Sequence, residues 1–230
     1  MRTLCIDIGG TGLKALVFEP DGAPRGERVR VATPRPATPE AVLAALEALT
    51  APLGAYDRVS VGFPGVVVDG VTRTAPNLDP AWADFPLAAT LERRTGKPVR
   101  VANDAGVQGL AVIEGKGVEV VITLGTGMGF GLYVDGHYVP NIEMAHHPYG
   151  HGKDQTYEER VGEAARLEIG NKRWRGRVAK VIAQLAPILN YRRLYLGGGN
   201  SERLDPADLP ADVTIVSNVA GLIGGLKLWS

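Results

Sequence analysis

Two glycine-rich turns in the sequence each carry a threonine hydroxyl, and each follows an apolar, β-rich run. They read Asp7-Ile8-Gly9-Gly10-Thr11-Gly12 and Leu124-Gly125-Thr126-Gly127-Met128-Gly129. Glycine has no Cβ, so consecutive backbone amides can converge on an anion while the threonine adds a hydroxyl donor. Between the turns, an Asn103-Asp104 step follows a third expected strand. The three segments together indicate a clamp around a transferred phosphoryl group, although glycines alone also serve ordinary hairpins.

The segments that position the first turn form an expected antiparallel meander followed by a helix. Pro20-Asp21-Gly22 turns the chain between strands, and Thr38-Pro39 supplies a helix N-cap and a proline at the first helical position. The expected strands of this half cover residues 4–8, 13–18, 29–32, 58–62 and 99–102, and its expected helices begin at 39, 87 and 104.

The second half repeats this layout around the second turn. Strands are expected over 118–124 and 130–134, and Asp135-Gly136 forms a two-residue hairpin turn. The pattern further predicts helices near 158–169, 178–189 and 219–228, and strands over 193–196 and 213–216, the former ending in Gly197-Gly198-Gly199. The sequence therefore predicts two lobes of similar plan.

Composition excludes several classes of function. The 230 residues carry 25 basic and 25 acidic side chains, so no overall charge favours a nucleic acid or a membrane as partner. The single cysteine, Cys5, lies inside the first expected strand, which fits a reducing compartment and no thiolate-rich metal site. No signal peptide or membrane span is apparent, and we expect a cytoplasmic protein.

The doubled layout resembles the ROK family (repressor, open reading frame, kinase), which implies an α/β, two-lobed, actin-like or ribonuclease-H-like sugar kinase fold with mixed sheets. The motifs that carry the resemblance are residues 7–11, 74–78 with 84–87, 101–105 and 124–127. Residues 10–14 and 139–143, and the absence of a cysteine cluster, are most similar to the polyphosphate glucokinase branch. The resemblance implies a small N-terminal lobe over 1–102, completed by a C-terminal helix over 219–230, and a larger lobe over 103–218.

The family's catalytic step corresponds to Asn103-Asp104 in this sequence. The resemblance implies that Asp104 is the general base and that Asn103 binds a neighbouring sugar hydroxyl. Taken alone, the pattern favours a helix N-cap for Asp104, and Asn103 could equally close a turn. Asp7, at the end of the first strand, would order Mg²⁺ through water, although an isolated aspartate there often only starts a turn.

The implied phosphate ligands come from both turns, with the Gly-rich strand end near Gly198 holding adenosine in relatives that use ATP. A polyphosphate donor would instead need a line of cations. The basic residues around Trp174 could form such a line or simply a solvated helix face. The expected phosphate-binding residues are Asp7, Gly9, Gly10, Thr11, Lys14, Gly125, Thr126, Gly127 and Gly198, and the basic cluster is Lys172, Arg173, Arg175, Arg177 and Lys180.

The family's sugar motif corresponds to Glu143-Met144-Ala145-His146. Glu143 and His146 keep the positions that would bind ring hydroxyls, whereas Ala145 stands where the family has glycine. We expect the second sugar carboxylate in the Glu158-Glu159 pair and choose Glu159; both could also form the solvated first turn of a helix.

Metal and partner expectations follow from the same resemblance. The histidines at 146, 147 and 151 have no thiols near them, so we expect no structural zinc, and Mg²⁺ is the expected cofactor. The implied activity is transfer of a phosphoryl group from polyphosphate or ATP to the 6-hydroxyl of glucose by a homodimer. The alternatives are an ATP-dependent kinase for mannose, fructose or an N-acetylated hexosamine, and a catalytically silent sugar sensor. A DNA-bound repressor is not expected, because no helix-turn-helix precedes the first strand.

Overall fold

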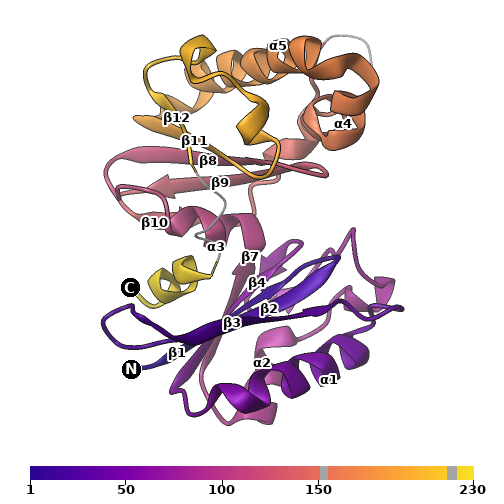
Figure 1. Ribbon diagram of the computed structural model, residues 1–230, viewed down its shortest axis with the longest axis vertical. Helices are drawn as coiled ribbons and strands as arrows, with labels where there is room; N and C mark the ends of the chain where they lie inside the picture. Colours follow the sequence, from indigo (N-terminus) through magenta and orange to yellow (C-terminus); the bar gives the residue numbers. More distant parts are fainter. Residues whose placement is uncertain (151–154, 217–221) are drawn as a thin grey trace. The chain divides into compact units, whose positions relative to one another are not determined.

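The computed structural model describes residues 1–150, 155–216 and 222–230 and divides into two compact units. Unit 1 contains Met1–Ala111 and Ala220–Ser230, and unit 2 contains Val112–Val219. Each unit is built on one five-stranded sheet that mixes parallel and antiparallel pairs (Figure 1).

The sheet of unit 1 has the strand order β3-β2-β1-β4-β7. The first three strands form an antiparallel meander, and β1, β4 and β7 are parallel to one another. This confirms the meander expected around the first glycine turn. The strands are β1 (Thr3–Ile8), β2 (Gly12–Phe18), β3 (Pro24–Ala32), β4 (Arg58–Phe63) and β7 (Val99–Asn103).

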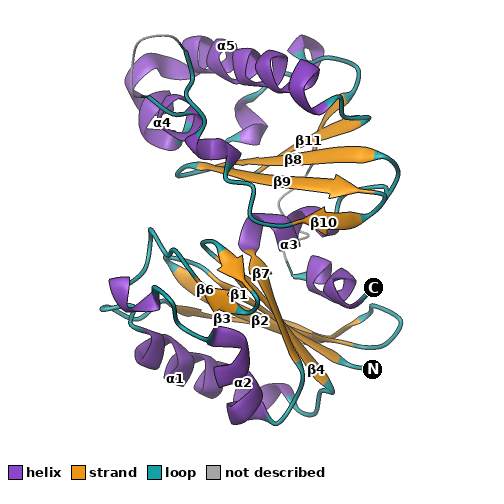
Figure 2. Cartoon of the chain, turned by 180° about the vertical axis from the view of Figure 1, so that it is seen from behind, coloured by secondary structure: helices purple, strands orange, loops and turns teal. Residues whose placement is uncertain are grey.

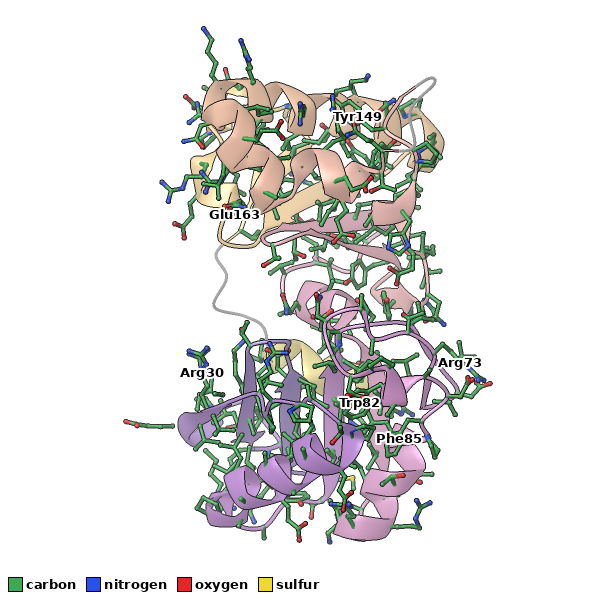
Figure 3. The ribbon with its side chains drawn as sticks, turned by 90° about the vertical axis from the view of Figure 1, so that its right-hand side faces the viewer. Arg30, Arg73, Trp82, Phe85, Tyr149 and Glu163 are labelled. Carbon is green, nitrogen blue, oxygen red and sulfur yellow. The ribbon has the colours of Figure 1, made fainter. Side chains whose placement is uncertain are left out.

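Two helices, α1 (Pro39–Thr50) and α2 (Leu87–Thr95), cover one face of this sheet (Figure 2). The Thr38 hydroxyl caps α1 by accepting from the Ala41 amide at 3.3 Å, as the sequence predicts. Trp82 fills the space between these helices and the sheet. Its indole donates to the Ala37 carbonyl at 2.8 Å, and its ring lies 5.3 Å from that of Phe85 (Figure 3).

The opposite face of the unit 1 sheet is covered by α3 (Asp104–Leu110) and by the C-terminal 3-10 helix η7 (Ile223–Trp229). The sequence predicts an α-helix over 219–228. Residues 217–221 lie outside the described residues, and the described part is a 3-10 helix. A Cβ on Gly224 would collide with the Val107 carbonyl, and Gly225 packs against Cys5 and Ser60. Glycines allow this close contact, but they favour an α-helix poorly.

The sheet of unit 2 has the order β10-β9-β8-β11-β12, so its strand–turn–strand centre repeats that of unit 1. β8, β9 and β10 form the antiparallel meander, and β8, β11 and β12 are parallel. The strands are β8 (Val118–Leu124), β9 (Met128–Val134), β10 (His137–Val139), β11 (Arg193–Gly197) and β12 (Val213–Ile215).

Helices α4 (Tyr157–Val161) and α5 (Glu163–Leu189) pack on one face of this sheet. The sequence predicts two helices with a gap over 170–177, whereas only Gly170 in α5 departs from helical geometry, with φ 77° and ψ 158°. Trp174 explains the added turns. Its side chain is fully buried, and its indole donates to the Val161 carbonyl at 2.7 Å.

The remaining elements are short. None of the described helices combines the length and apolar character that a bilayer span requires. The short elements are the hairpin β5 (Val67–Val68) and β6 (Val71–Thr72), and the 3-10 helices η1 (Ala51–Leu53), η2 (Pro80–Trp82), η3 (Met144–His146), η4 (Ser201–Arg203) and η5 (Pro206–Asp208).

Candidate active site

The first glycine turn joins β1 to β2 and is closed by its own backbone. The Gly9 amide donates to the Gly12 carbonyl at 3.0 Å, and a Cβ on Gly9 would lie 2.9 Å from that carbonyl oxygen. The Thr33 hydroxyl donates to the Gly9 carbonyl at 2.5 Å, while Thr11 is exposed at the tip of the turn. The turn is therefore rigid at its base and presents a hydroxyl and backbone amides at its tip.

Asp7 and Asp104 border one space above Gly62. The register places Asp7 beside Gly62, and Gly62 beside Ala102 at the end of β7. A Cβ on Gly62 would lie 3.8 Å from Asp7 Oδ1 and 3.6 Å from Asp104 Cβ. Because Gly62 has no side chain, the space between these two carboxylate-bearing residues stays open by about the size of a methyl group.

Asn103, and not Asp104, caps helix α3. Asn103 Oδ1 accepts from the Gly106 amide at 3.2 Å, and its Nδ2 donates to the Gly65 carbonyl at 3.2 Å. Asp104 is the first residue of the helix, half-buried, and its Oδ1 accepts from the Ala105 amide at 2.8 Å. The cap that sequence alone could assign to Asp104 is thus already supplied by its neighbour.

Lys14 forms an ion pair with Asp7. Its ammonium donates to Asp7 Oδ2 at 2.7 Å, and the two residues face each other across the β1–β2 register. Sequence suggests a phosphate ligand or an exposed strand lysine at position 14. The structure shows a half-buried cation paired with an aspartate whose side chain is only 11% exposed.

Asp7 fits the expected Mg²⁺ role. Mg²⁺ in phosphoryl-transfer sites is held by one or two carboxylates together with substrate phosphate oxygens. Asp7 offers one carboxylate whose Oδ1 is directed toward the space above Gly62. As for zinc, no three His, Cys, Asp or Glu side chains converge within the part of the chain that the structure describes. His151 lies outside that part, and the expected lack of zinc stays a prediction.

The second glycine turn joins β8 to β9 in unit 2 and is held by two neighbouring segments. The Gly125 amide donates to the Gly127 carbonyl at 3.0 Å. The Gly125 carbonyl accepts from the Glu163 amide at 3.0 Å and from Asn200 Nδ2 at 3.1 Å. Thr126 remains exposed, as Thr11 does in the first turn.

Gly198 lies against the base of the second turn. Its φ of 84° is in the left-handed region, and a Cβ there would collide with the Leu124 backbone. The next segment continues this contact, because the Asn200 amide donates to the Leu124 carbonyl at 3.0 Å. The structure therefore places Gly198 where its backbone supports the second turn.

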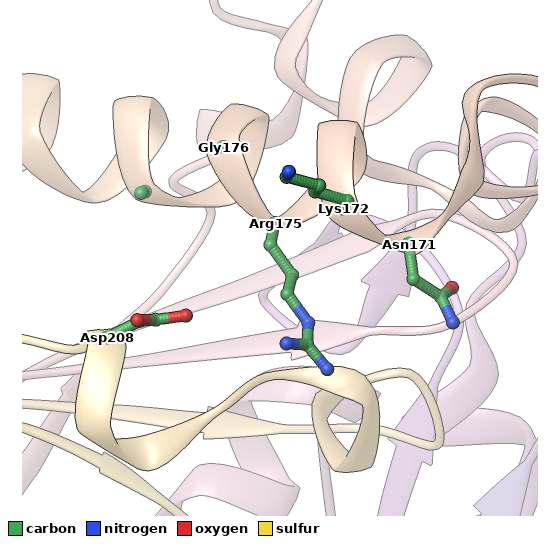
Figure 4. Close-up of a pocket in the computed structure, with 6 residues that line it drawn as sticks. Asn171, Lys172, Arg175, Gly176 and Asp208 are labelled. Atoms are coloured by element: carbon green, nitrogen blue, oxygen red, sulfur yellow. The ribbon is translucent and has the colours of Figure 1, made fainter.

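A hollow of about 650 Å³ lies between α5 and the segment that follows Gly198 (Figure 4). Arg175 extends from α5 along the hollow, and its Nε donates to the Arg203 carbonyl at 2.6 Å. The volume is in the range of small-molecule sites. The hollow is lined by Asn171, Lys172, Arg175, Gly176, Ala179 and Asp208.

The basic cluster around Trp174 does not form one line. Lys172 and Arg175 border the hollow. Arg177 instead donates to the Arg160 carbonyl at 3.4 Å, and the Lys180 ammonium lies 4.4 Å from the Tyr149 ring centre. The helical period separates these cations onto different sides of α5.

The expected sugar ligands Glu143 and His146 lie at either end of η3, where the His146 amide donates to the Glu143 carbonyl at 3.1 Å. Both side chains are exposed. Glu158 joins them, because its Oε2 lies 3.9 Å from His146 Nε2 and its side chain fills the space beside Gly127. Ala145 is buried in the core of unit 2, which explains how a Cβ is accommodated there.

Glu159, the sequence choice, is turned away into a capping box. Its carboxylate accepts from the Thr156 amide at 2.7 Å, and its own amide donates to the Thr156 hydroxyl at 3.3 Å. Sequence reasoning thus passed over Glu158. The sequence carried a signal for this: Thr156 is followed three residues later by Glu159, which is the pattern of a capping box and assigns Glu159 to the cap.

Tyr149 fixes the segment that carries these residues. Its ring lies between the cations of Arg160 and Lys180, at 5.1 Å and 4.4 Å, and is 6.4 Å from the Tyr157 ring. Gln184 Nε2 donates to its carbonyl at 3.3 Å. The contacts with Lys180 and Gln184 hold the segment that follows η3 against α5.

Comparison with known proteins agrees with the sequence resemblance. The model of the ROK family matches residues 3–161. A polyphosphate glucokinase of Mycobacterium tuberculosis (strain CDC 1551 / Oshkosh) is 32% identical over 235 residues, which cover 95% of this chain and 88% of the relative. An N-acetylmannosamine kinase of Escherichia coli (strain SE11) is 40% identical over 142 residues, covering 59% of this chain and 48% of that kinase.

A solved structure extends the agreement to the fold. The inorganic polyphosphate/ATP-glucomannokinase from Arthrobacter sp. strain KM is 32% identical and superposes with a TM-score of 0.84. The match covers 99% of this chain and 97% of that one. The α/β sugar kinase fold with mixed sheets, expected from the sequence, is confirmed.

Proposed function

Because the chain belongs to the ROK family and is a phosphotransferase of the hexokinase type, we propose that it phosphorylates the 6-hydroxyl of glucose or a related hexose. The relatives named above support polyphosphate, ATP or both as the donor. The observation that carries the proposal is the space above Gly62, bordered by Asp7 and Asp104 and adjoining the first glycine turn.

Asp104 is the proposed general base. Its carboxylate accepts the proton of the attacking hydroxyl while Asn103, fixed by its bonds to Gly106 and Gly65, keeps one amide hydrogen for a neighbouring sugar hydroxyl. A well-placed base contributes about 10²- to 10⁴-fold in rate. Positioning and charge neutralisation supply most of the remaining acceleration.

The proposed phosphate contacts are backbone amides of the two turns with the hydroxyls of Thr11 and Thr126. Mg²⁺ would supply charge neutralisation on the donor oxygens when bound, held to this chain by water on Asp7. Lys14 would act through Asp7, pairing with that carboxylate and orienting it rather than contacting phosphate directly.

For the sugar we propose Glu143, His146 and Glu158 as ligands. Glu158 replaces the earlier choice of Glu159, since the Glu159 carboxylate is committed to the cap of α4. A carboxylate accepts from sugar hydroxyls, and the imidazole can donate to or accept from them.

An ATP-dependent kinase for another hexose is the second candidate. The hollow between α5 and η5 is large enough for a nucleoside, and the N-acetylmannosamine kinase supports an N-acetylated acceptor. A homodimer and a cytoplasmic location, implied by the resemblance, stay predictions.

A coupled assay tests the proposal. Glucose and Mg²⁺ are offered with polyphosphate or with ATP, and sugar phosphate should form with at least one donor, be lost with EDTA and return with Mg²⁺. Mannose, fructose and N-acetylmannosamine then rank the acceptors. If no combination of donor and sugar gives a product while glucose still raises the Tm, the protein is a sugar sensor and not a kinase.

A further inference from the structure

Three arginines of unit 1 gather beside the first glycine turn. Arg30 on β3 lies directly across from Lys14 on β2, so both side chains share one face of the sheet. Arg28 is two residues earlier on the same strand, where the pairing with β2 shifts its register, and it is exposed. Arg35, just beyond β3, donates through its guanidinium to the Gly10 carbonyl at 2.8 Å.

Arg30 also reaches the turn. A Cβ on Gly12 would lie 2.9 Å from Arg30 Nε, so the guanidinium packs against the backbone of that glycine. Figure 3 shows Arg30 projecting clear of the sheet at its edge. Gly10 and Gly12 are thus flanked by two guanidinium groups, while Lys14 is already neutralised by Asp7.

These arginines have no acidic partner among the residues that the structure describes. Arg28, Arg30 and Arg35 are all exposed, and none of them forms an ion pair with a described residue. A cation on an edge strand deters sheet extension, and that role needs no contact with the turn. Two guanidinium groups packed on the turn backbone indicate a ligand with more negative charge than the single phosphoryl group proposed for the turn.

We infer that Arg35, Arg30 and Arg28 form a track along β3 for a linear polyanion, inorganic polyphosphate, whose terminal phosphoryl group occupies the first turn. The inference rests on the proposed function and adds the binding site of its donor. Guanidinium binds phosphate oxygens through paired donors, and residues two apart on a strand lie about 6.6 Å apart. A polymer with charge on every unit can contact such a row continuously, whereas ATP carries only three phosphates.

The double variant Arg28→Gln/Arg30→Gln tests the track. The KM for long-chain polyphosphate should rise roughly tenfold, because each exposed phosphate contact contributes up to about fivefold. The kcat and the KM values for ATP and glucose should stay unchanged. The slope of log KM against log salt should fall by about two, one for each lost phosphate contact. Direct titration with polyphosphate, without turnover, should show the same loss of affinity.

Arg25→Gln is the matched control on the same strand. Arg25 lies 3.8 Å from Glu19 and donates to the Ala55 carbonyl, so it is already occupied, and its loss should leave the KM for polyphosphate unchanged. Lys172→Gln/Arg175→Gln tests the competing surface on α5. Weaker polyphosphate binding in that variant, with normal binding in Arg28→Gln/Arg30→Gln, would overturn the track.

The outcomes separate this inference from the proposed function. Turnover of ATP without binding of polyphosphate would refute the track and leave the kinase intact. Arginine-dependent binding of polyphosphate without turnover of any donor would support the track and refute the kinase. Polyphosphate binding that survives the loss of Arg28, Arg30 and Arg35 together would also refute the track.

Discussion

At the scale of single residues, Gly62 keeps the space between Asp7 and Asp104 open, because it has no side chain. Asp7 lies near the end of β1 and Asp104 begins α3 directly after β7, and both lie against Gly62 on β4. The capping of α3 falls to Asn103, so the proposed role of Asp104 as base does not compete with a capping role. Because Asn103 carries the cap, the proposed base can be changed without removing the cap of α3.

Asp104→Asn should therefore keep the fold and lose turnover. We expect kcat to fall by about 10²- to 10⁴-fold, because the amide cannot accept the hydroxyl proton, with a smaller change in the KM for glucose. Steady-state kinetics and a thermal melt measure both effects. Asp79→Asn is the control in the same unit, since Asp79 caps η2 and asparagine caps equally well. Unchanged turnover in Asp104→Asn would exclude Asp104 as the base.

Glu158→Gln and Glu159→Gln form a matched pair of neighbours. Glu158→Gln should raise the KM for glucose about ten- to a hundredfold, the range for a hydrogen bond to a charged group. Glu159→Gln should change neither KM nor Tm, because glutamine also completes a capping box. Isothermal titration with glucose and a thermal melt distinguish the two. If Glu159→Gln weakens glucose binding and Glu158→Gln does not, then Glu159 is the sugar ligand, as the sequence predicts.

The sequence predicted the positions of the glycine turns and of the Asn103-Asp104 step. It did not predict which of two adjacent residues forms a cap and which faces a site. Motif spacing locates a turn within a residue or two, whereas the roles of Glu158 and Glu159 depend on the residue at which α4 begins. The pairing of Lys14 with Asp7 depends on strand register. Both features could have been predicted from the sequence. The Thr156-x-x-Glu159 pattern indicates that Glu159 caps the helix, and the tight hairpin between β1 and β2 fixes which residues pair.

At the scale of elements, one buried carboxylate ties the start of β8 to the chain before it. Glu119 is fully buried, accepts from the amides of Glu114, Gly115 and Lys116 at 2.7 to 3.0 Å, and accepts from the Tyr195 hydroxyl at 2.8 Å. Burial alone raises the Glu119 pKa, but these hydrogen bonds outweigh it and the net pKa is lowered. Burial and the same carboxylate raise the pKa of Tyr195 to about 12.

The lowered Glu119 pKa predicts acid-sensitive stability. A carboxyl whose folded pKa lies below its unfolded value stabilises fully above the unfolded value, and the stabilisation is lost as pH falls through the folded value. Glu119→Gln should lower the free energy of unfolding by about 2–4 kcal/mol at pH 7. The difference from the parent should shrink below about pH 4.3, as measured by denaturant titration at pH 7 and pH 4. A difference independent of pH would contradict the role of the charge.

Helix lengths were predicted less well than strand positions. Most strands are short apolar runs, and local hydrophobicity marks them. The exception is β3, which is charged and exposed and begins at Pro24 instead of the expected residue 29. The gap expected over 170–177 is instead helical, because a single buried side chain, Trp174, faces the sheet among charged residues. The hydrophobic period therefore fades although the helix continues.

At the scale of the whole molecule, the doubled layout was predicted because both units repeat strand, glycine turn and strand in the same sheet order. The packing of the last residues, η7, on the sheet of unit 1 is not marked by any local sequence pattern. It depends on contacts such as Ser60 Oγ donating to the Gly225 carbonyl at 2.7 Å, across 165 residues of sequence. The hollow beside α5 is likewise formed by segments distant in sequence and was not predicted.

The C-terminal segment covers the strand that carries Cys5, and this gives a chemical test of the closure. The Cys5 thiol is buried, and burial raises its pKa to about 12, so it should resist alkylation at pH 8. A Cβ on Gly225 would lie 2.8 Å from Cys5 Sγ and 3.0 Å from Ser60 Cβ, so valine at position 225 cannot fit without displacing η7. Trp229, which donates to Ser60 Oγ at 2.8 Å, should move with it.

Gly225→Val should thus lower the Tm by several degrees and make Cys5 reactive toward iodoacetamide under native conditions, since an exposed thiol has a pKa near 8.5. Labelling reports Cys5 alone, because the chain has one cysteine, and Cys5→Ser serves as the blank. Trp229→Phe keeps most of the ring contact with Arg58 and Arg100 and should leave the thiol protected. If Cys5 stays unreactive in a folded Gly225→Val protein, the thiol is protected by the sheet itself, and the last residues are not what closes unit 1.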